Sequence, residues 1–301
     1  MRRARGRRGA PQARRAGGLP GAPKIASLAG PCYFLRHGPR SDRQTSRRLP
    51  YPGPLLGPVS PFLPNAAFRH PRGWLMGMHW DDLLFAHWPV APEALRHLVP
   101  PGLDLDLFEG RAWISVVPFR MSHVRPRYFP GLPGISSFCE LNVRTYVVRK
   151  AIPGVWFFSL EASNPVAVRA ARRFFHLPYF DAEMRMERKG DRIGYASRRT
   201  HPGAAAADFI GEYGPTGPAY RAAPGSLEDW LTARYCLYSA DDEGGLYRVN
   251  VHHKPWRLQP ADAEIRINTM TMPIGLRLEG SPLLQFAAKT EVAGWMPERL
   301  V

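Results

Sequence analysis

The chain has 301 residues and a formal net charge of +16, and this charge is concentrated at one end. Of its 41 Lys and Arg residues, 15 lie before residue 74, together with one of the 25 acidic residues. The rest of the chain is therefore nearly neutral, and its composition gives no reason to expect a nucleic-acid surface on the folded part.

Residues 1–73 form the basic segment, which also contains 12 Pro and 10 Gly. Such a segment has too little apolar surface to offset chain entropy, so we predict a disordered tail. Two alternatives stay open. The translation start could be mis-assigned, with Met76 or Met78 beginning the protein, or the arginines could bind nucleic acid or anionic lipid.

The sequence contains no secretion signal and no membrane span that we recognise. No apolar core follows the N-terminal arginines, and no stretch approaches 18 consecutive apolar residues. The three cysteines, Cys32, Cys139 and Cys236, have neither metal-binding spacing nor an even number. We therefore expect a cytoplasmic protein without a membrane partner.

Residues 74–301 are long enough for one domain with a full core. Twelve short apolar or alternating segments predict strands, and three segments with a proline at the first turn or a polar N-cap predict short helices. The predicted strands lie at 83–86, 103–107, 112–119, 138–148, 155–161, 179–188, 192–200, 208–213, 235–239, 246–253, 263–268 and 290–295, and the predicted helices begin near Pro92, Asn164 and Ser226. Residues 121–135 are expected to form a long loop.

This order of elements favours a mostly β protein of the α+β class. We predict a curved antiparallel sheet that closes into a cone-like barrel, with the few short helices outside it. A doubly wound parallel sheet is unlike this pattern. The helix from Asn164 to Phe175 should bury Val166, Ala170 and Phe174, which repeat every four residues.

The segment from Phe138 to Ser163 is the centre of the functional argument. It alternates so that Glu140, Asn142, Arg144 and Tyr146 share one face of a strand, with Cys139, Leu141 and Val143 on the other. A four-residue turn at 151–154 would pair Arg144 with Glu161 and Tyr146 with Ser159. The result is a polar strip along the hairpin, made of Glu140, Asn142, Arg144, Tyr146, Ser159 and Glu161. It would either face solvent or line a pocket inside the barrel.

The common catalytic and cofactor motifs are absent from the sequence. We find no G-x-G-x-x-G, P-loop, H-E-x-x-H, G-x-S-x-G or C-x-x-C, so we predict no cofactor. His252 and His253 are adjacent on a strand and point to opposite faces, which argues against a metal site. His253 shares a face with Val249 and Val251, so it is either a structural histidine or a substrate-binding residue.

Several segments together resemble one family. They are 92–103, 140–146, 156–160, 176–179 and 253–256, and they are similar to the YqjF-like family of uncharacterised conserved proteins, the domain of unknown function 2071. That family is similar in fold to acetoacetate decarboxylase, a cone-like barrel with an internal pocket. The resemblance covers roughly residues 79–297 and favours a polar strip that faces the pocket.

The resemblance also implies what chemistry to expect and what is missing. Decarboxylases of this fold use a lysine that forms a Schiff base with a ketone. The family's active-site glutamate corresponds to Glu140, but the segment 172–179, where the lysines should lie, contains none. Arginine stays protonated and cannot form the imine, so we expect no Schiff-base decarboxylase activity.

Two functions remain as hypotheses for the domain. The first is a pocket that binds a small organic acid or carbonyl compound. Arg144 would anchor a carboxylate, Glu140 would act as acid or base, and Asn142 and Tyr146 would orient the ligand, with Ser159, Glu161 and His253 as further contacts. The second is a non-catalytic structural or binding module on the same fold.

Overall fold

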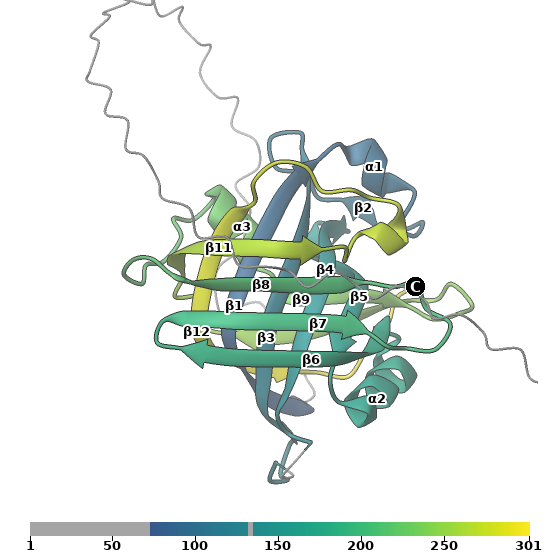
Figure 1. Cartoon of the computed structure of the whole chain (residues 1–301). Helices are drawn as coiled ribbons and strands as arrows, with labels where there is room; N and C mark the ends of the chain where they lie inside the picture. Colours follow the sequence, from purple (N-terminus) through teal and green to yellow (C-terminus); the bar gives the residue numbers. More distant parts are fainter. Residues whose placement is uncertain (1–72, 132–134) are drawn as a thin grey trace, which may run out of the picture. The chain divides into compact units, whose positions relative to one another are not determined.

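The computed structural model describes residues 73–131 and 135–301 of the chain (Figure 1). The predicted tail and the alternative functions assigned to it lie outside the described residues, apart from Gly73. In chain order the elements are β1 (Met76–Val90), α1 (Pro92–Arg96), β2 (Asp104–Leu105), β3 (Ala112–Pro126), β4 (Phe138–Arg149), β5 (Ile152–Ala162), α2 (Pro165–Phe175), β6 (Tyr179–Lys189), β7 (Arg192–Arg199), β8 (Asp208–Pro215), α3 (Leu227–Thr232), β9 (Cys236–Ala240), β10 (Leu246–His253), β11 (Gln259–Asn268), a 3-10 turn (Met272–Ile274), β12 (Leu283–Gly294) and β13 (Glu298–Arg299). Within the described ranges, no helix has the length and apolar character needed to cross a membrane.

Five long strands in the order β12-β1-β3-β4-β5 form a central antiparallel sheet. Each outer strand of this sheet has two neighbours on its free edge. β5 pairs with β9 near its start and with β6 near its end, while β12 pairs with β11 and then with β10. The sheet therefore closes twice, once through β9 and β10 and once through β6, β7, β8 and β11.

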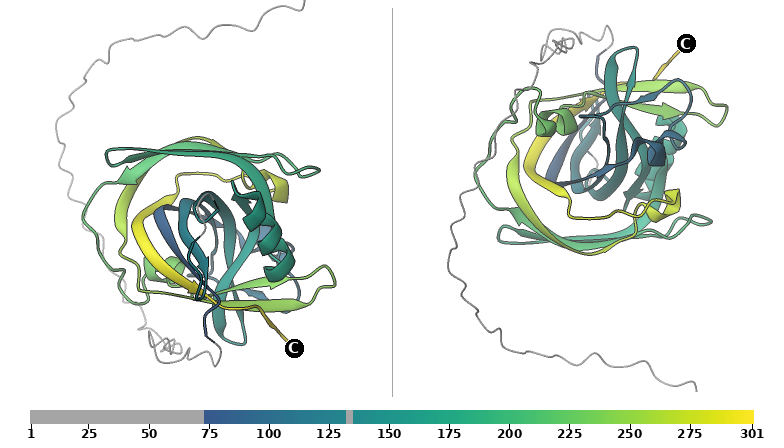
Figure 2. Two further views of the ribbon diagram at one scale, coloured as in Figure 1. Left: turned by 90° about the horizontal axis from the view of Figure 1, so that it is seen from below. Right: turned by 90° about the horizontal axis from the view of Figure 1, so that it is seen from above.

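The predicted closed, mostly β barrel with a few short helices is confirmed. The strands β6, β7, β8 and β11 cross in front of the long strands (Figure 1), and the end views show them as an arc wrapped around the central sheet (Figure 2). The sheet is mixed because β5 pairs in parallel with β6 and β9. Helix α2 connects β5 to β6 and lies at the periphery of this arc.

Both faces of the central sheet are buried, and they belong to different cores. Along β1, Leu83 and Phe85 join one cluster with Phe119 of β3. The alternating Leu84 and Ala86 join a second cluster with the side chains of β7 and β8. A strand buried on both sides needs a continuous apolar run, which explains the sequence at 83–86. The first core surrounds the site described below.

The hairpin of β4 and β5 has a different register from the predicted one. Arg149 pairs with Ile152, so the turn is the two-residue Lys150–Ala151, with φ values of 47° and 61°. Positive φ at both central residues is typical of the type I′ turn that suits a twisted hairpin. The predicted Pro153–Gly154 turn is wrong, because these residues already belong to β5. Gly154 is required there because a Cβ would lie 2.8 Å from the Cys236 sulfur.

A β-bulge further along β5 changes which of its side chains lie on the same face of the sheet as Glu140, Asn142 and Arg144. The register shifts between Val143 and Arg144, where Val143 pairs with Ser159 but Arg144 pairs with Phe157. An extra residue in one strand reverses the facing of everything beyond it. As a result, Phe157 and Leu160 both face the first core.

Helix α2 begins as the sequence predicts but buries another face. The Asn164 Oδ1 accepts hydrogen bonds from the backbone N–H groups of Val166 (3.0 Å) and Ala167 (3.2 Å). Val166 and Phe174 are exposed, whereas Val168 is buried. The predicted Val166, Ala170 and Phe174 face is therefore wrong, because the helix packs through Val168 and the neighbouring Ala167, Ala171 and Phe175.

The predicted long loop at 121–135 is shorter than expected at its first end. β3 continues through Pro126, pairing with Met76 at the start of β1. Met121 is buried in the first core and Val124 packs against it. The exposed Arg125 and the prolines at 126 and 130 gave this segment the composition of a loop.

Candidate functional site

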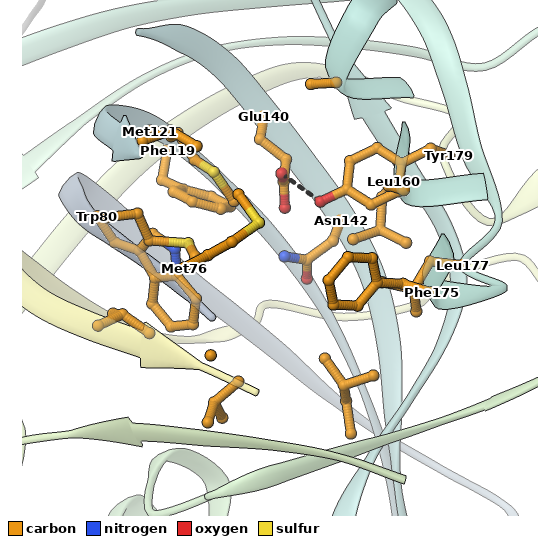
Figure 3. Close-up of a pocket in the computed structure, with 18 of the residues that line it drawn as sticks. Met76, Trp80, Phe119, Met121, Glu140, Asn142, Leu160, Phe175, Leu177 and Tyr179 are labelled. Atoms are coloured by element: carbon orange, nitrogen blue, oxygen red, sulfur yellow. Dashed lines mark hydrogen bonds between the residues drawn. The ribbon is translucent and has the colours of Figure 1, made fainter. Parts of the chain in front are cut away.

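A cavity of about 430 Å³ lies on the face of the central sheet that carries the first core. It is bordered by β1, β3, β4, β5, α2 and β10, and most of its wall is apolar. Figure 3 shows Met76, Trp80, Phe119 and Met121 on one side, with Leu160, Phe175 and Leu177 on the other. Such a size and lining are typical of small-molecule sites. Glu140, Asn142 and Arg144 of the β4 strip line this cavity, which matches one of the two alternatives left open by the sequence.

Glu140 extends from β4 into this cavity and is 2% exposed. The Tyr179 hydroxyl, at the start of β6, donates a hydrogen bond to its Oε2 at 2.7 Å (Figure 3). Burial raises the pKa of Glu140 to about 8, although Tyr179 and Asn142 beside the carboxyl oppose the rise. At neutral pH the side chain is thus mostly protonated. A neutral carboxyl in an apolar cavity is a hydrogen-bond donor and a general acid.

Arg144 lines the same cavity two residues beyond Asn142. Its guanidinium lies over the Phe85 ring, 5.5 Å from the ring centre, and its Nε is buried without a hydrogen-bond partner. Among residues 73–131 and 135–301, no carboxylate lies within 4.0 Å of this guanidinium. Asn142 Oδ1 is also buried without a partner. Unsatisfied buried polar atoms are costly, so they mark where a ligand can contribute.

Arg234, a second cavity-lining arginine, differs from Arg144 by having a carboxylate partner, although its Nη2 is also buried without a hydrogen bond. Its Nη1 donates to Asp106 at 2.5 Å and its Nε donates to the Trp230 carbonyl at 2.7 Å. The group also lies 5.0 Å from the Tyr146 ring centre. Its charge is therefore neutralised inside the protein, whereas that of Arg144 is not.

His253 of β10 lines the cavity, as one alternative from the sequence allows. It is buried between Tyr235 and Trp256, with ring centres 4.8 Å away from each. Its Nδ1 lies 2.8 Å from the Lys254 carbonyl and its Nε2 lies 3.3 Å from the Arg234 carbonyl. Burial lowers the pKa of this histidine, and its hydrogen bonds to the two carbonyls oppose the fall. Its contacts are those of a structural residue.

Tyr146 does not line the cavity, although it shares the β4 face with Arg144. Its hydroxyl contacts Ser115 Oγ at 2.7 Å and His87 Nδ1 at 3.2 Å. His87 also contacts Gln285 at 3.2 Å, and burial lowers its pKa to about 3, with the charge of Arg144 adding to the effect. This network lies outside the cavity. The sequence analysis did not identify it. The available indication was His87, a polar residue directly after the apolar run 83–86.

Ser159 and Glu161 lie on the opposite face of β5 from the cavity, which corrects the predicted strip. Because of the bulge, they face the second layer of strands. There the Arg199 Nε of β7 donates to Glu161 Oε1 at 3.0 Å, and Ser159 Oγ donates to Glu161 Oε2 at 3.2 Å. Burial raises the pKa of Glu161, and Arg199 beside it opposes the rise. These groups form a structural ion pair.

Of the seven residues predicted for the site, the structure places Glu140, Asn142, Arg144 and His253 at the cavity. The sequence did not identify Tyr179 as a site residue, although the segment 176–179 contributed to the resemblance. Tyr179 reaches Glu140 because β6 pairs in parallel with the end of β5. Within the described ranges, no three His, Cys, Asp or Glu side chains are placed to hold a metal ion together.

The fold and its internal cavity define this chain as a protein with an acetoacetate decarboxylase-like fold. An acetoacetate decarboxylase superposes with a TM-score of 0.56 at 13% identity, covering 76% of this chain and 90% of the other. The enzyme from Legionella pneumophila subsp. pneumophila str. Philadelphia 1 gives a TM-score of 0.52 at 13% identity, covering 75% and 87%. The enduracididine biosynthesis enzyme MppR, complexed with pyruvate, gives 0.53 at 14% identity, covering 81% and 98%.

The sequence itself is related to a narrower group. Residues 77–291 match the family described as an uncharacterised conserved protein, the domain of unknown function 2071. The uncharacterised protein YqjF of Bacillus subtilis (strain 168) is 48% identical over 223 residues, which cover 74% of this chain and 91% of that protein. The chain therefore belongs to this YqjF-like family, as the sequence segments predicted.

Proposed function

We propose that this domain binds a small organic acid or carbonyl compound inside the barrel, with Arg144 as the anchor for a carboxylate. The observation that carries the proposal is the state of Arg144: a cavity-lining guanidinium with a buried, unpartnered Nε and no carboxylate among its described neighbours. A planar guanidinium in an apolar setting pairs well with a carboxylate. A bound acid would supply the missing acceptor and neutralise the charge.

Glu140 is proposed as the acid of the site. At neutral pH its carboxyl holds a proton because burial raises its pKa to about 8. Tyr179 donates to one oxygen of this carboxyl, so the other oxygen can donate its proton to a ligand oxygen. Asn142, between Glu140 and Arg144 on β4, offers an amide that would orient the same ligand. Together these groups suit a ligand with a carboxylate and a neutral oxygen.

The proposal does not include Schiff-base decarboxylation. Among the described residues that line the cavity there are two arginines, Arg144 and Arg234, and no lysine. A guanidinium stays protonated and does not attack a carbonyl. The alternative of a purely structural module would need a packed interior, and the cavity of about 430 Å³ favours a ligand instead.

A thermal-shift screen tests the proposal. Small carboxylic and oxo acids at millimolar concentration should raise the melting temperature of the wild-type protein, and uncharged analogues should raise it less. Arg144→Ala should abolish the shift. The matched control is Arg266→Ala, which removes an exposed arginine of β11 and should leave the shift intact. If no acid stabilises the protein, or if the shift survives Arg144→Ala, the proposal is wrong.

A further inference from the structure

The cavity is much larger than a short organic acid. One water molecule occupies roughly 30 Å³ of liquid, so 430 Å³ corresponds to about fourteen atoms of that size. An acid of three or four carbons would leave more than half of this space empty. Empty apolar space costs stability, because the lining side chains lose their contacts. The volume therefore indicates a ligand with a larger body.

Three polar side chains that line the cavity lie on one strand, β4. Glu140, Asn142 and Arg144 are spaced by two residues on β4, which places the Cα atoms of the first and last about 13 Å apart. A ligand with its carboxylate at Arg144 therefore runs along β4 past Asn142 toward Glu140. The part of the ligand beyond Asn142 lies against the apolar side chains that surround Glu140.

Around Glu140 the wall is formed by flexible and aromatic apolar groups. Figure 3 shows Met76 and Met121 on one side of Glu140, and Phe175 and Leu177 on the other. Methionine side chains adapt to a chain that is itself flexible. Helix α2 completes this part of the wall with small side chains, including Ala170, which is exposed and lies at the rim of the cavity. The space between them is an apolar compartment that suits methylene groups.

We infer that the ligand is an amphiphilic monocarboxylic acid of medium length, about ten to fourteen non-hydrogen atoms, with its carboxylate at Arg144 and its apolar chain between α2 and the methionines of β1 and β3. An oxygen substituent on the chain would meet the Glu140 carboxyl. This inference rests on the proposed function and extends it from a head group to a whole ligand class. The wall supplies the affinity, because each buried methylene adds to binding, and Arg144 supplies the selectivity for an acid.

The test is calorimetric titration of the full chain with straight-chain acids from acetate to hexadecanoate, and with 1-decanol. Affinity should rise about fourfold for each added methylene up to acids of about eight to twelve carbons, and then fall once the compartment is full. Arg144→Ala should weaken decanoate at least tenfold and leave 1-decanol unchanged. Ala170→Phe, at an exposed position of α2, should fold normally and shift the optimum to shorter acids, whereas Ala170→Ser should not.

The outcomes separate this inference from the proposed function. If short acids bind and affinity does not grow with chain length, the inference is wrong and the proposed function stands. If hexadecanoate binds as tightly as decanoate, or Ala170→Phe leaves the optimum unchanged, the apolar compartment is not where we place it. If no acid of any length binds, or 1-decanol binds wild type as tightly as decanoate does, the proposed function fails as well.

Discussion

Two buried glutamates on neighbouring strands have opposite surroundings. Glu140 on β4 faces the cavity, with a tyrosine hydroxyl as its partner, and burial raises its pKa to about 8. Glu161 on β5 faces the second layer of strands and pairs with Arg199. Conversely, Arg144 of the cavity has no described carboxylate beside it. The Glu161–Arg199 pair is thus satisfied within the protein, whereas Glu140 and Arg144, which line the cavity, have no ion-pair partner among the described residues.

The largest expected effect concerns the pH dependence of stability. The folded state retains the Glu140 proton between pH 4.5 and about 8, whereas the unfolded chain has lost it. The free energy of unfolding should therefore fall as pH rises through this window, by on the order of 5 kcal/mol. Glu140→Gln should match wild type near pH 4.5 and be more stable at pH 8. Urea unfolding across this range measures it.

Glu264→Gln is the control for that prediction, because Glu264 is exposed on β11. It should retain the wild-type dependence on pH. Parallel pH curves for wild type and Glu140→Gln would mean that Glu140 is ionised in the folded protein, and the contrast between the two glutamates would disappear.

The second effect compares one substitution on the two faces. Arg199→Ala leaves Glu161 buried without its cation, and we expect a loss of about 3 to 5 kcal/mol of unfolding free energy. Arg144→Ala removes a guanidinium that no described carboxylate needs, so its cost should stay below about 1 kcal/mol. Urea denaturation at pH 7 measures both variants. The double variant Glu161→Gln/Arg199→Ala should recover part of the loss.

Equal costs for the two arginine variants would contradict this comparison. They would show that Arg144 has an internal partner after all, and that its face of the sheet is as fully satisfied as the other.

The smallest effect concerns the turn that sets the hairpin register. Ala151 has a φ of 61°, which disfavours any residue with a Cβ. Ala151→Gly should therefore stabilise the protein by about 0.5 to 1 kcal/mol, measured by thermal or urea unfolding. The same substitution at Ala91, where φ is −65°, should give no gain. A loss of stability at Ala151 would indicate another turn geometry, and with it another separation of Glu140 from Glu161.

The sequence predicted most of the fold and part of the site, for identifiable reasons. The strict alternation from Cys139 to Val147 placed Glu140, Asn142 and Arg144 on one face, and the structure agrees. The Asn164 cap was equally clear. The hairpin register was missed because Lys150 and Ala151 are unusual at positive φ, whereas Pro153–Gly154 has the composition of a turn. The bulge in β5 has no signal in the sequence.

By itself the sequence determined that the chain forms a closed, mostly β barrel, that it belongs to the YqjF-like family, and which β4 side chains point the same way. These features follow from local periodicity and from sequence similarity. The tertiary structure decided that this face lines a cavity, that Tyr179 reaches Glu140 while Tyr146 lies outside the cavity, and that Ser159 and Glu161 belong to the other side. Such contacts depend on register and on strand pairings distant in the chain, and a shift of one residue reverses them.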